Sequence, residues 1–178
     1  MALKSTKDQY GVVAVSTHWL TATLILILIG SGFGAANAVD SAAKAAILRV
    51  HVPVAIFVLG LMIVRMLWWW LLDRKPESVA GSPRWQEGTA HLVHVLLYVL
   101  VLGMIATGIG LIALSGAGPL IFAGHGARLP DFWNYPPRLL HGIGARLLLG
   151  LLVLHAGAAL YHHFARRDRL LWRMWFRT

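Results

Sequence analysis

The sequence predicts an all-α integral membrane protein that folds as a four-helix bundle. Its 178 residues are 58% hydrophobic and only 13% charged, and the mean hydropathy of +0.67 is too high for a soluble domain of this length. Four apolar runs are long enough to cross a hydrocarbon core of about 30 Å. The segments between them are too short to bury a core of their own, so we expect one transmembrane domain covering residues 1–178.

The first predicted helix covers residues 12–36 and carries His18 in its opening turns. This apolar run is too long for the core of a signal peptide, so we expect it to remain in the mature protein. Glycines near its far end would let another helix or a flat ligand approach the backbone closely: Gly30, Gly32 and Gly34.

The second predicted helix covers residues 42–72, with His51 near its start and Arg65 toward its end. An arginine there can extend its charge to the membrane surface while its alkyl stem stays among apolar groups. It can equally serve as the partner of an anionic group held inside the bundle. Both interpretations of Arg65 stay open at this point.

The third predicted helix covers residues 85–114 and brings in His91 and His94, three residues apart on neighbouring parts of one helix face. We expect both to lie near the same membrane surface as His18, because the chain has by then crossed the bilayer twice.

The fourth predicted helix covers residues 137–164 and contains His141 and His155. The segment between them rises about 21 Å and makes nearly four whole turns, so both imidazoles should leave the same helix face. One should lie near each membrane surface. An imidazole facing lipid would be costly, so each should point into the bundle toward a partner from another helix.

Depth in the membrane pairs histidines of different helices: His18 with His155, and His51 with His141. Two bis-imidazole pairs suit haem b better than zinc, which usually gathers three or four ligands at one centre. We therefore expect two haem b groups with these four histidines as iron ligands. The propionates would be buried anions, and Arg65, with Arg146 as a weaker candidate, could neutralise them.

The absence of cysteine, and of acidic residues deep in the spans, excludes several classes of cofactor and site. There is no cysteine, which excludes disulfides, covalently attached haem and cysteine-ligated iron–sulfur clusters. The seven Asp and Glu residues lie outside the deep parts of the predicted spans. A transporter or divalent-metal protein without haem is the alternative class, and a cation path of that kind would need carboxylates inside the membrane.

The net charge of +9 reports topology rather than nucleic-acid binding, because the charges lie between or beside the spans. The basic, tryptophan-containing tail at residues 166–177 is expected to lie on anionic membrane lipid. The larger basic set shares a side with both termini, which we expect to be the cytoplasm: Lys4, Lys7, Arg74, Lys75, Arg84, Arg166, Arg167, Arg169, Arg173 and Arg177. The opposite loops hold fewer such residues: Lys44, Arg49, Arg128 and Arg138.

Histidine-containing segments that lie in order on all four predicted helices resemble the bacterial di-haem cytochromes b of the cytochrome b561 family. That family is related to the cytochrome b subunits of hydrogenase and formate dehydrogenase. The resemblance covers nearly the whole chain and rests on these segments: Ser16-Thr17-His18-Trp19-Leu20, Val50-His51-Val52, Ala90-His91-Leu92-Val93-His94, His141, Leu154-His155-Ala156 and Ala159-Leu160-Tyr161-His162-His163.

The resemblance implies a location for each haem and for a quinone. It assigns His18 with His155 to a cytoplasmic haem and His51 with His141 to a periplasmic haem. It also implies a ubiquinone site near the cytoplasmic haem, where a histidine could hydrogen-bond a quinone carbonyl and supply a proton. The candidates are His91, His94 and His162; the alternative is that these histidines only contact water, lipid headgroups or a propionate.

Short stand-alone members of the family resemble a superoxide:ubiquinone oxidoreductase. The resemblance therefore implies an enzyme of the bacterial inner membrane that takes electrons from periplasmic superoxide and delivers them to ubiquinone. The basic outer loops could attract an anion, although ordinary solvation of loops explains them as well. In the alternative function, the chain keeps both haems but is the electron-transfer subunit of a periplasmic hydrogenase or dehydrogenase, its redox partner.

Overall fold

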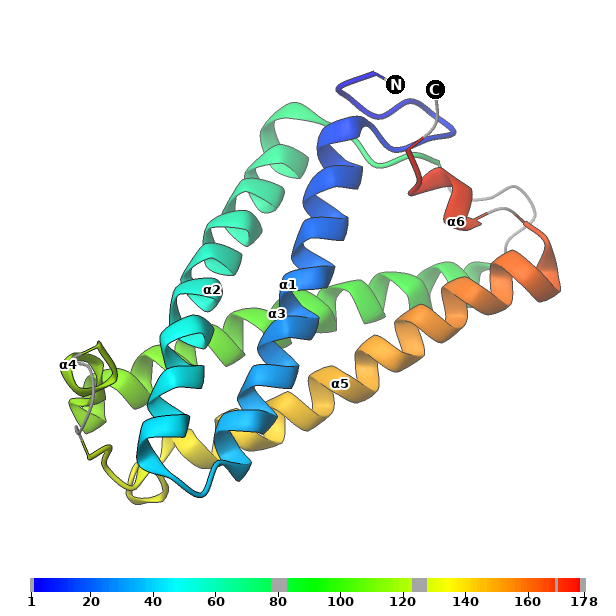
Figure 1. Ribbon diagram of the computed structural model, residues 1–178. Helices are drawn as coiled ribbons and strands as arrows, with labels where there is room; N and C mark the ends of the chain where they lie inside the picture. Colours follow the sequence, from blue (N-terminus) through cyan, green and yellow to red (C-terminus); the bar gives the residue numbers. More distant parts are fainter. Residues whose placement is uncertain (1, 78–82, 123–127, 169, 177–178) are drawn as a thin grey trace. The chain divides into compact units, whose positions relative to one another are not determined.

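The computed structural model describes residues 2–77, 83–122, 128–168 and 170–176, and every regular element within these ranges is a helix (Figure 1). The predicted all-α fold class is therefore confirmed. Arg169 and Arg177 lie outside the described residues. Four helical segments are long and apolar enough to cross a membrane: Val12–Asn37, Ser41–Leu72, Arg84–Ser115 and Pro137–Arg166.

The ends of these segments lie within two residues of the ranges predicted from hydropathy. The side of the membrane on which the termini lie stays a prediction. The long helices are α1 (Val12–Asn37), α2 (Ser41–Leu67), α3 (Arg84–Ser115) and α5 (Pro137–Tyr161). The short elements are the π-helical turns η1 (Trp68–Leu72) and η3 (His162–Arg166), the 3-10 turn η2 (Phe132–Asn134), and the helices α4 (Ala117–Phe122) and α6 (Leu170–Arg173).

Local side chains explain where several helices begin. The Asp40 carboxylate accepts hydrogen bonds from the backbone N–H groups of Ala42 and Ala43, at 3.2 and 2.9 Å, and so caps the start of α2. Pro137 opens α5, where its missing N–H has no helical partner to lose.

The third predicted helix ends at residue 114, and α3 ends one residue later, at Ser115. Gly116, Gly118 and Pro119 are helix-breaking residues, yet only Gly116 interrupts the helix, with a φ of +64°. The Ser115 hydroxyl then accepts a hydrogen bond from the N–H of Ala117 at 3.3 Å, and α4 begins. Pro119 is accommodated because it falls in the first turn of α4.

The chain divides into two compact units. Unit 1 consists of Met1–Ala22, Gly60–Tyr98 and Gly150–Thr178, and unit 2 consists of Thr23–Leu59 and Val99–Leu149. Unit 1 therefore contains His18, His155 and the candidate quinone histidines, whereas unit 2 contains His51 and His141. That the whole chain forms one domain stays a prediction.

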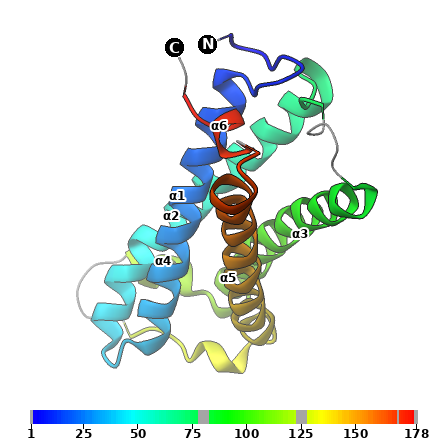
Figure 2. The ribbon, with the colours of Figure 1, turned by 90° about the vertical axis from the view of Figure 1, so that its right-hand side faces the viewer.

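In unit 1, the two ends of the described chain lie close together, and α6 approaches the N-terminal segment (Figures 1 and 2). The guanidinium of Arg173 donates to the backbone oxygens of Asp8 at 2.8 Å and Glu77 at 2.6 Å. Trp19 of α1 donates its indole N–H to the carbonyl of Met174 at 2.7 Å. The tail therefore contacts the rest of unit 1 through Arg173 and Met174. The sequence analysis expected the tail to lie on membrane lipid and did not predict these contacts.

A second contact in unit 1 is centred on Asp73, which is only 8% exposed. Both of its oxygens lie 3.0 Å from the backbone N–H of Ser5, and Trp68 donates its indole N–H at 3.0 Å. Burial on its own would raise the pKa of Asp73. The hydrogen bonds from Ser5, Trp68 and Arg74 outweigh burial and hold the pKa below its ordinary value.

This contact predicts an acid-sensitive contribution to stability. Because the folded pKa of Asp73 lies below the unfolded value of about 3.9, the contribution is complete above that pH and is lost as the pH falls through the folded pKa. Asp73→Asn should lower the free energy of unfolding at pH 7 by about 1–3 kcal/mol and weaken the acid dependence. Thermal unfolding in detergent, followed by tryptophan fluorescence between pH 7 and pH 2.5, measures both effects.

The matched control is Glu77→Gln. Glu77 lies 3.9 Å from Lys7, and both side chains are more than 70% exposed, so this pair should contribute less than about 1 kcal/mol. Equal losses of stability in the two variants would contradict the role assigned to Asp73.

Candidate functional site

In unit 2, His51 of α2 and His141 of α5 face one another. Their ring centres are 6.4 Å apart and their planes are inclined by 64°. Both side chains are half-buried. The pairing predicted from depth alone therefore brings these two imidazoles into the same small region of unit 2.

Each of these imidazoles is held by a hydroxyl from a neighbouring helix. Ser31 Oγ of α1 lies 2.9 Å from His51 Nδ1, and Thr107 Oγ1 of α3 lies 2.9 Å from His141 Nδ1. The single proton of each hydroxyl has an acceptor on its own helix: Leu28 O at 3.2 Å for Ser31, and Gly103 O or Met104 O at 2.9 Å for Thr107.

This arrangement indicates the tautomer of both rings. Because each hydroxyl donates its proton to a helix carbonyl, it can accept the Nδ1–H of the imidazole. A neutral histidine with its proton on Nδ1 has a free lone pair on Nε2. His51 and His141 can therefore both offer Nε2 as a metal ligand.

Glycines make room for these rings. A Cβ atom at Gly32 would lie 3.4 Å from Cε1 of His51, and one at Gly108 would lie 3.4 Å from Cε1 of His141. A larger side chain at either position would displace the ring. The predicted use of a glycine for close approach thus applies to Gly32, whereas nothing lies within 4 Å of a Cβ built at Gly30.

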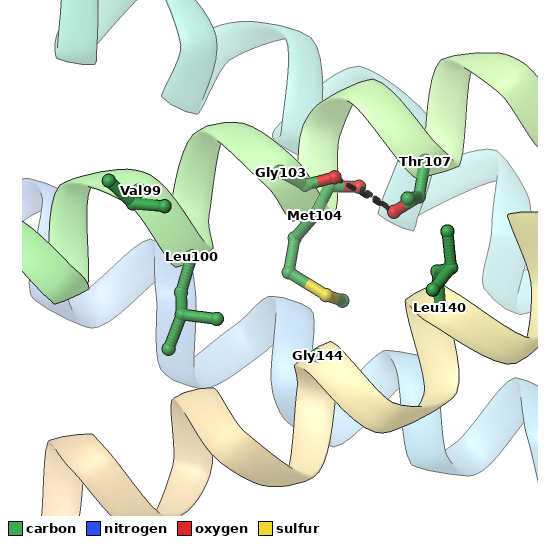
Figure 3. Close-up of a pocket in the computed structure, with 7 residues that line it drawn as sticks. All are labelled: Val99, Leu100, Gly103, Met104, Thr107, Leu140 and Gly144. Atoms are coloured by element: carbon green, nitrogen blue, oxygen red, sulfur yellow. Dashed lines mark hydrogen bonds between the residues drawn. The ribbon is translucent and has the colours of Figure 1, made fainter.

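A pocket of about 230 Å³ lies between α3 and α5 in unit 2, beside the hydroxyl of Thr107 (Figure 3). Met104 extends from α3 toward Gly144 of α5, where a Cβ would come within 2.7 Å of the methionine sulfur. Apart from the Thr107 hydroxyl, the side chains around the pocket are apolar, so it suits a hydrocarbon group. Its lining consists of Val99, Leu100, Gly103, Met104, Thr107, Leu140 and Gly144.

Unit 1 contains the second predicted pair. The ring centres of His18, from α1, and His155, from α5, are also 6.4 Å apart, with planes inclined by 62°. A third imidazole, His94 of α3, lies closer to His155, at 5.3 Å between ring centres. His91 is exposed one turn earlier on α3.

Both 6.4 Å separations fit a metal ion held between two imidazoles. Two metal–nitrogen bonds of about 2 Å, with roughly 1 Å from each nitrogen to its ring centre, make about 6 Å. The closer pair formed by His94 and His155 is too short for this arrangement. Within the described residues, no three His, Asp or Glu side chains are grouped so that they could hold a metal ion.

Arg65 lies in unit 1 and makes only long hydrogen bonds. Its guanidinium is 3.4 Å from the hydroxyls of Tyr98 and Thr17 and 3.5 Å from the carbonyl of Ala14. These partners are all neutral. Arg146, the other candidate for a propionate, lies in unit 2 with an exposed side chain that donates to Gly142 O of its own helix at 2.9 Å.

The candidate quinone ligand His162 belongs to a polar cluster at the start of η3. Its Nδ1 is hydrogen-bonded to the carboxylate of Asp168, and its Nε2 contacts the side-chain amide of Gln86 from α3. The carboxylate can only accept, so it fixes the Nδ1–H tautomer. The His162 and Asp168 side chains are 17% and 19% exposed, so the pair is accessible without being fully solvated.

Sequence reasoning missed the residues that hold the histidines. The hydroxyls of Ser31 and Thr107 and the polar groups of Asp168 and Gln86 were not predicted to take part. The sequence does contain one pattern that could have indicated the two hydroxyls. Ser31 and Thr107 are each followed by two glycines at the same spacing, in Ser31-Gly32-Phe33-Gly34 and Thr107-Gly108-Ile109-Gly110. The position of Asp168, beyond the end of the last predicted span, gave no such signal.

The chain is similar in sequence to known bacterial proteins over nearly its whole length. The sequence model of the family described as prokaryotic cytochrome b561 matches residues 9–177. Cytochrome b561 homolog 1 of Escherichia coli (strain K12) is 27% identical over 176 residues, covering 94% of this chain and 97% of that protein. Cytochrome b561 homolog 2 of the same organism is 25% identical over 190 residues, covering 98% and 95%. Probable superoxide oxidase CybB of Yersinia pestis is 25% identical over 169 residues, covering 93% and 95%.

Proposed function

Because the chain belongs to the prokaryotic cytochrome b561 family, whose members bind haem b and transfer electrons in the membrane, we propose that it is a di-haem superoxide:ubiquinone oxidoreductase. The observation that carries the proposal is the recurrence of one geometry in both units. Each unit presents two half-buried imidazoles from different helices, with ring centres 6.4 Å apart.

In this proposal His18 and His155 hold the haem of unit 1, and His51 and His141 hold the haem of unit 2. Each haem supplies an iron that takes up and releases one electron at a time. The protein residues orient the imidazoles that would hold each haem. Arg65, whose present partners are neutral and distant, would neutralise a propionate in unit 1.

The distribution of charge supports an orientation in the bacterial inner membrane. Unit 1 contains both termini and most of the basic residues, so we place it at the cytoplasmic surface. Unit 2, with fewer basic residues in its loops, would face the periplasm. Superoxide would then donate electrons at unit 2, and ubiquinone would accept them at unit 1.

Two superoxide anions are needed for each quinone. Each superoxide gives up one electron and becomes O₂, while ubiquinone takes up two electrons and two protons and becomes ubiquinol. Of the candidate histidines, the cluster around His162 is best suited to deliver those protons. Asp168 fixes the tautomer and orientation of the ring, and a quinone oxygen would take the place of the Gln86 amide at Nε2 to exchange a proton there.

The choice of superoxide as donor is supported by the name of one relative, the probable superoxide oxidase of Yersinia pestis, whose length the match covers almost fully. Two of the basic residues in unit 2 have structural contacts of their own. Arg49 donates to the carbonyl of Ile121 at 2.6 Å, and Arg138 lies 4.4 Å above the ring of Trp133. Their charges still favour the approach of an anion.

Haem content tests the ligand assignment. Replacing His18, His51, His141 or His155 by Ala should lower the haem-to-protein ratio from about two to about one, because a haem held by only one of its two histidines would be bound far less tightly. His18→Ala and His155→Ala should remove the same spectral component, and His51→Ala and His141→Ala the other. The matched control is His94→Ala, which should retain both haems. If His94→Ala lost a haem that His18→Ala kept, the assignment in unit 1 would be wrong.

The substrates are tested on purified wild-type protein in detergent. Superoxide should reduce the haems, and a soluble ubiquinone analogue should reoxidise them, with two superoxide anions consumed for each quinol formed. Reduced-minus-oxidised spectra and quinol absorbance follow both halves of the reaction. Two haems that ignore superoxide but are reduced through a co-purifying dehydrogenase would replace the superoxide proposal with the electron-transfer-subunit function.

The proton-delivery role is tested by Asp168→Asn. An Asn side chain can still accept the hydrogen bond that Asp168 receives from the N–H of Leu170, at 3.1 Å, so the start of α6 should be retained. Reoxidation of the haems by quinone should slow by about 10- to 100-fold, whereas their reduction by superoxide should be unchanged. Glu87→Gln, which alters an exposed acid next to Gln86, is the control and should leave both rates unchanged. Normal quinone kinetics in Asp168→Asn would remove this cluster from the mechanism.

A further inference from the structure

The two histidines of unit 2 are held by a repeated arrangement of a hydroxyl and a glycine. On α1, Ser31 contacts Nδ1 of His51 and Gly32 lies against the same ring. On α3, Thr107 and Gly108 do the same for His141. The distances match in both copies, with 2.9 Å for the hydroxyl contacts and 3.4 Å from a Cβ built at the glycine to Cε1 of the ring.

The repeat extends further along each helix. Two residues after each of these glycines comes a second one, Gly34 on α1 and Gly110 on α3. A Cβ at Gly34 would lie 3.7 Å from Ile47, and one at Gly110 would lie 3.3 Å from Pro137. Ile47 and Pro137 each stand four residues before the histidine of their helix. The pair α1–α2 and the pair α3–α5 therefore use the same register in unit 2.

Unit 1 is built differently. In the described part of unit 1, neither His18 nor His155 has a hydroxyl within hydrogen-bonding distance, and their ring contacts are with Trp19, His94 and one another. The two proposed haems thus differ in what their axial ligands bind. Both ligands in unit 2 donate Nδ1–H to a hydroxyl, whereas the ligands in unit 1 have no such partner among the described side chains.

From this difference we infer that Ser31 and Thr107 are positioning residues that fix His51 and His141, the histidines that would hold the unit 2 haem, and that they would lower its reduction potential. The inference rests on the proposed di-haem function. A hydroxyl that accepts Nδ1–H makes the imidazole a stronger electron donor, which stabilises the oxidised iron relative to the reduced iron. The haem of unit 2 would accordingly give up its electron more readily than it would without these hydroxyls.

The test is a potentiometric titration of both haems in holoprotein carrying Ser31→Ala or Thr107→Val. Each substitution removes one hydroxyl without adding a charge. The midpoint potential of one haem should shift upward, the same haem should shift in both variants, and the other haem should keep its wild-type potential. The double variant should shift that haem further. The EPR signal of the same ferric haem should change, because the ligand field of its imidazoles depends on the Nδ1 hydrogen bond.

Two controls separate the hydroxyl from a general effect of substitution. Ser31→Thr keeps a hydroxyl and should keep the wild-type potential. Ser115→Ala removes a hydroxyl of α3 that bonds to Leu111 O at 2.6 Å and to no histidine, and it should change neither potential. Unchanged potentials in both Ser31→Ala and Thr107→Val, or equal shifts in Ser115→Ala, would overturn the inference while leaving two haems in place. A wild-type protein without two haems would instead overturn the proposed function.

Should Ser31→Ala accumulate poorly, Thr107→Val and Thr107→Ser give the same comparison on α3. Thr107→Ser keeps the hydroxyl and should match the wild type, and a shift of the haem in Thr107→Ser as large as that in Thr107→Val would overturn the inference. Loss of only the unit 2 haem from Thr107→Val, with Thr107→Ser retaining it, would support the positioning role through haem content alone.

Discussion

An imidazole inside a membrane has two nitrogens that must both find partners, and this requirement organises unit 2. Lipid offers neither a donor nor an acceptor, so an unsatisfied nitrogen would be costly. Ser31 and Thr107 satisfy Nδ1 of His51 and His141, and both rings are left with Nε2 for a metal. A hydroxyl can reach a ring on the next helix only where the two backbones approach closely. The glycines that follow Ser31 and Thr107 allow that approach.

The spans of the fold follow from the sequence because hydropathy sums over many residues. The predicted ranges therefore lie within two residues of the structure. The pairing of His18 with His155 and of His51 with His141 follows equally from helix geometry, since depth depends only on the rise per residue. The hydroxyls could not be assigned in this way. Thr21 and Ser115 donate to carbonyls of their own helix and contact no histidine, yet Ser115 is followed by the same glycine pattern as Ser31, in Ser115-Gly116-Ala117-Gly118.

The π-helical turns were not predicted from the sequence. A π-helical turn places an extra residue in the helix and so redirects the side chains that follow it. After η1 comes Asp73, which collects hydrogen bonds from Ser5 and Trp68; after η3 comes Asp168, which holds His162. In both cases the aspartate follows the π-helical turn and hydrogen-bonds a side chain within it. Hydropathy carries no information about such partners.

The two units offer different chemistry, and the difference matches the two half-reactions of the proposed function. Oxidation of superoxide to O₂ moves one electron and no proton, so its site needs no titrating side chain beyond the ligands themselves. In unit 2 the partners of His51 and His141 are neutral hydroxyls, which exchange no protons at ordinary pH. Reduction of ubiquinone takes up protons, and unit 1 supplies groups that can carry them, in the hydrogen-bonded pair of His162 and Asp168. The assignment of donor and acceptor to the two units thus rests on proton chemistry as well as on the distribution of positive charge.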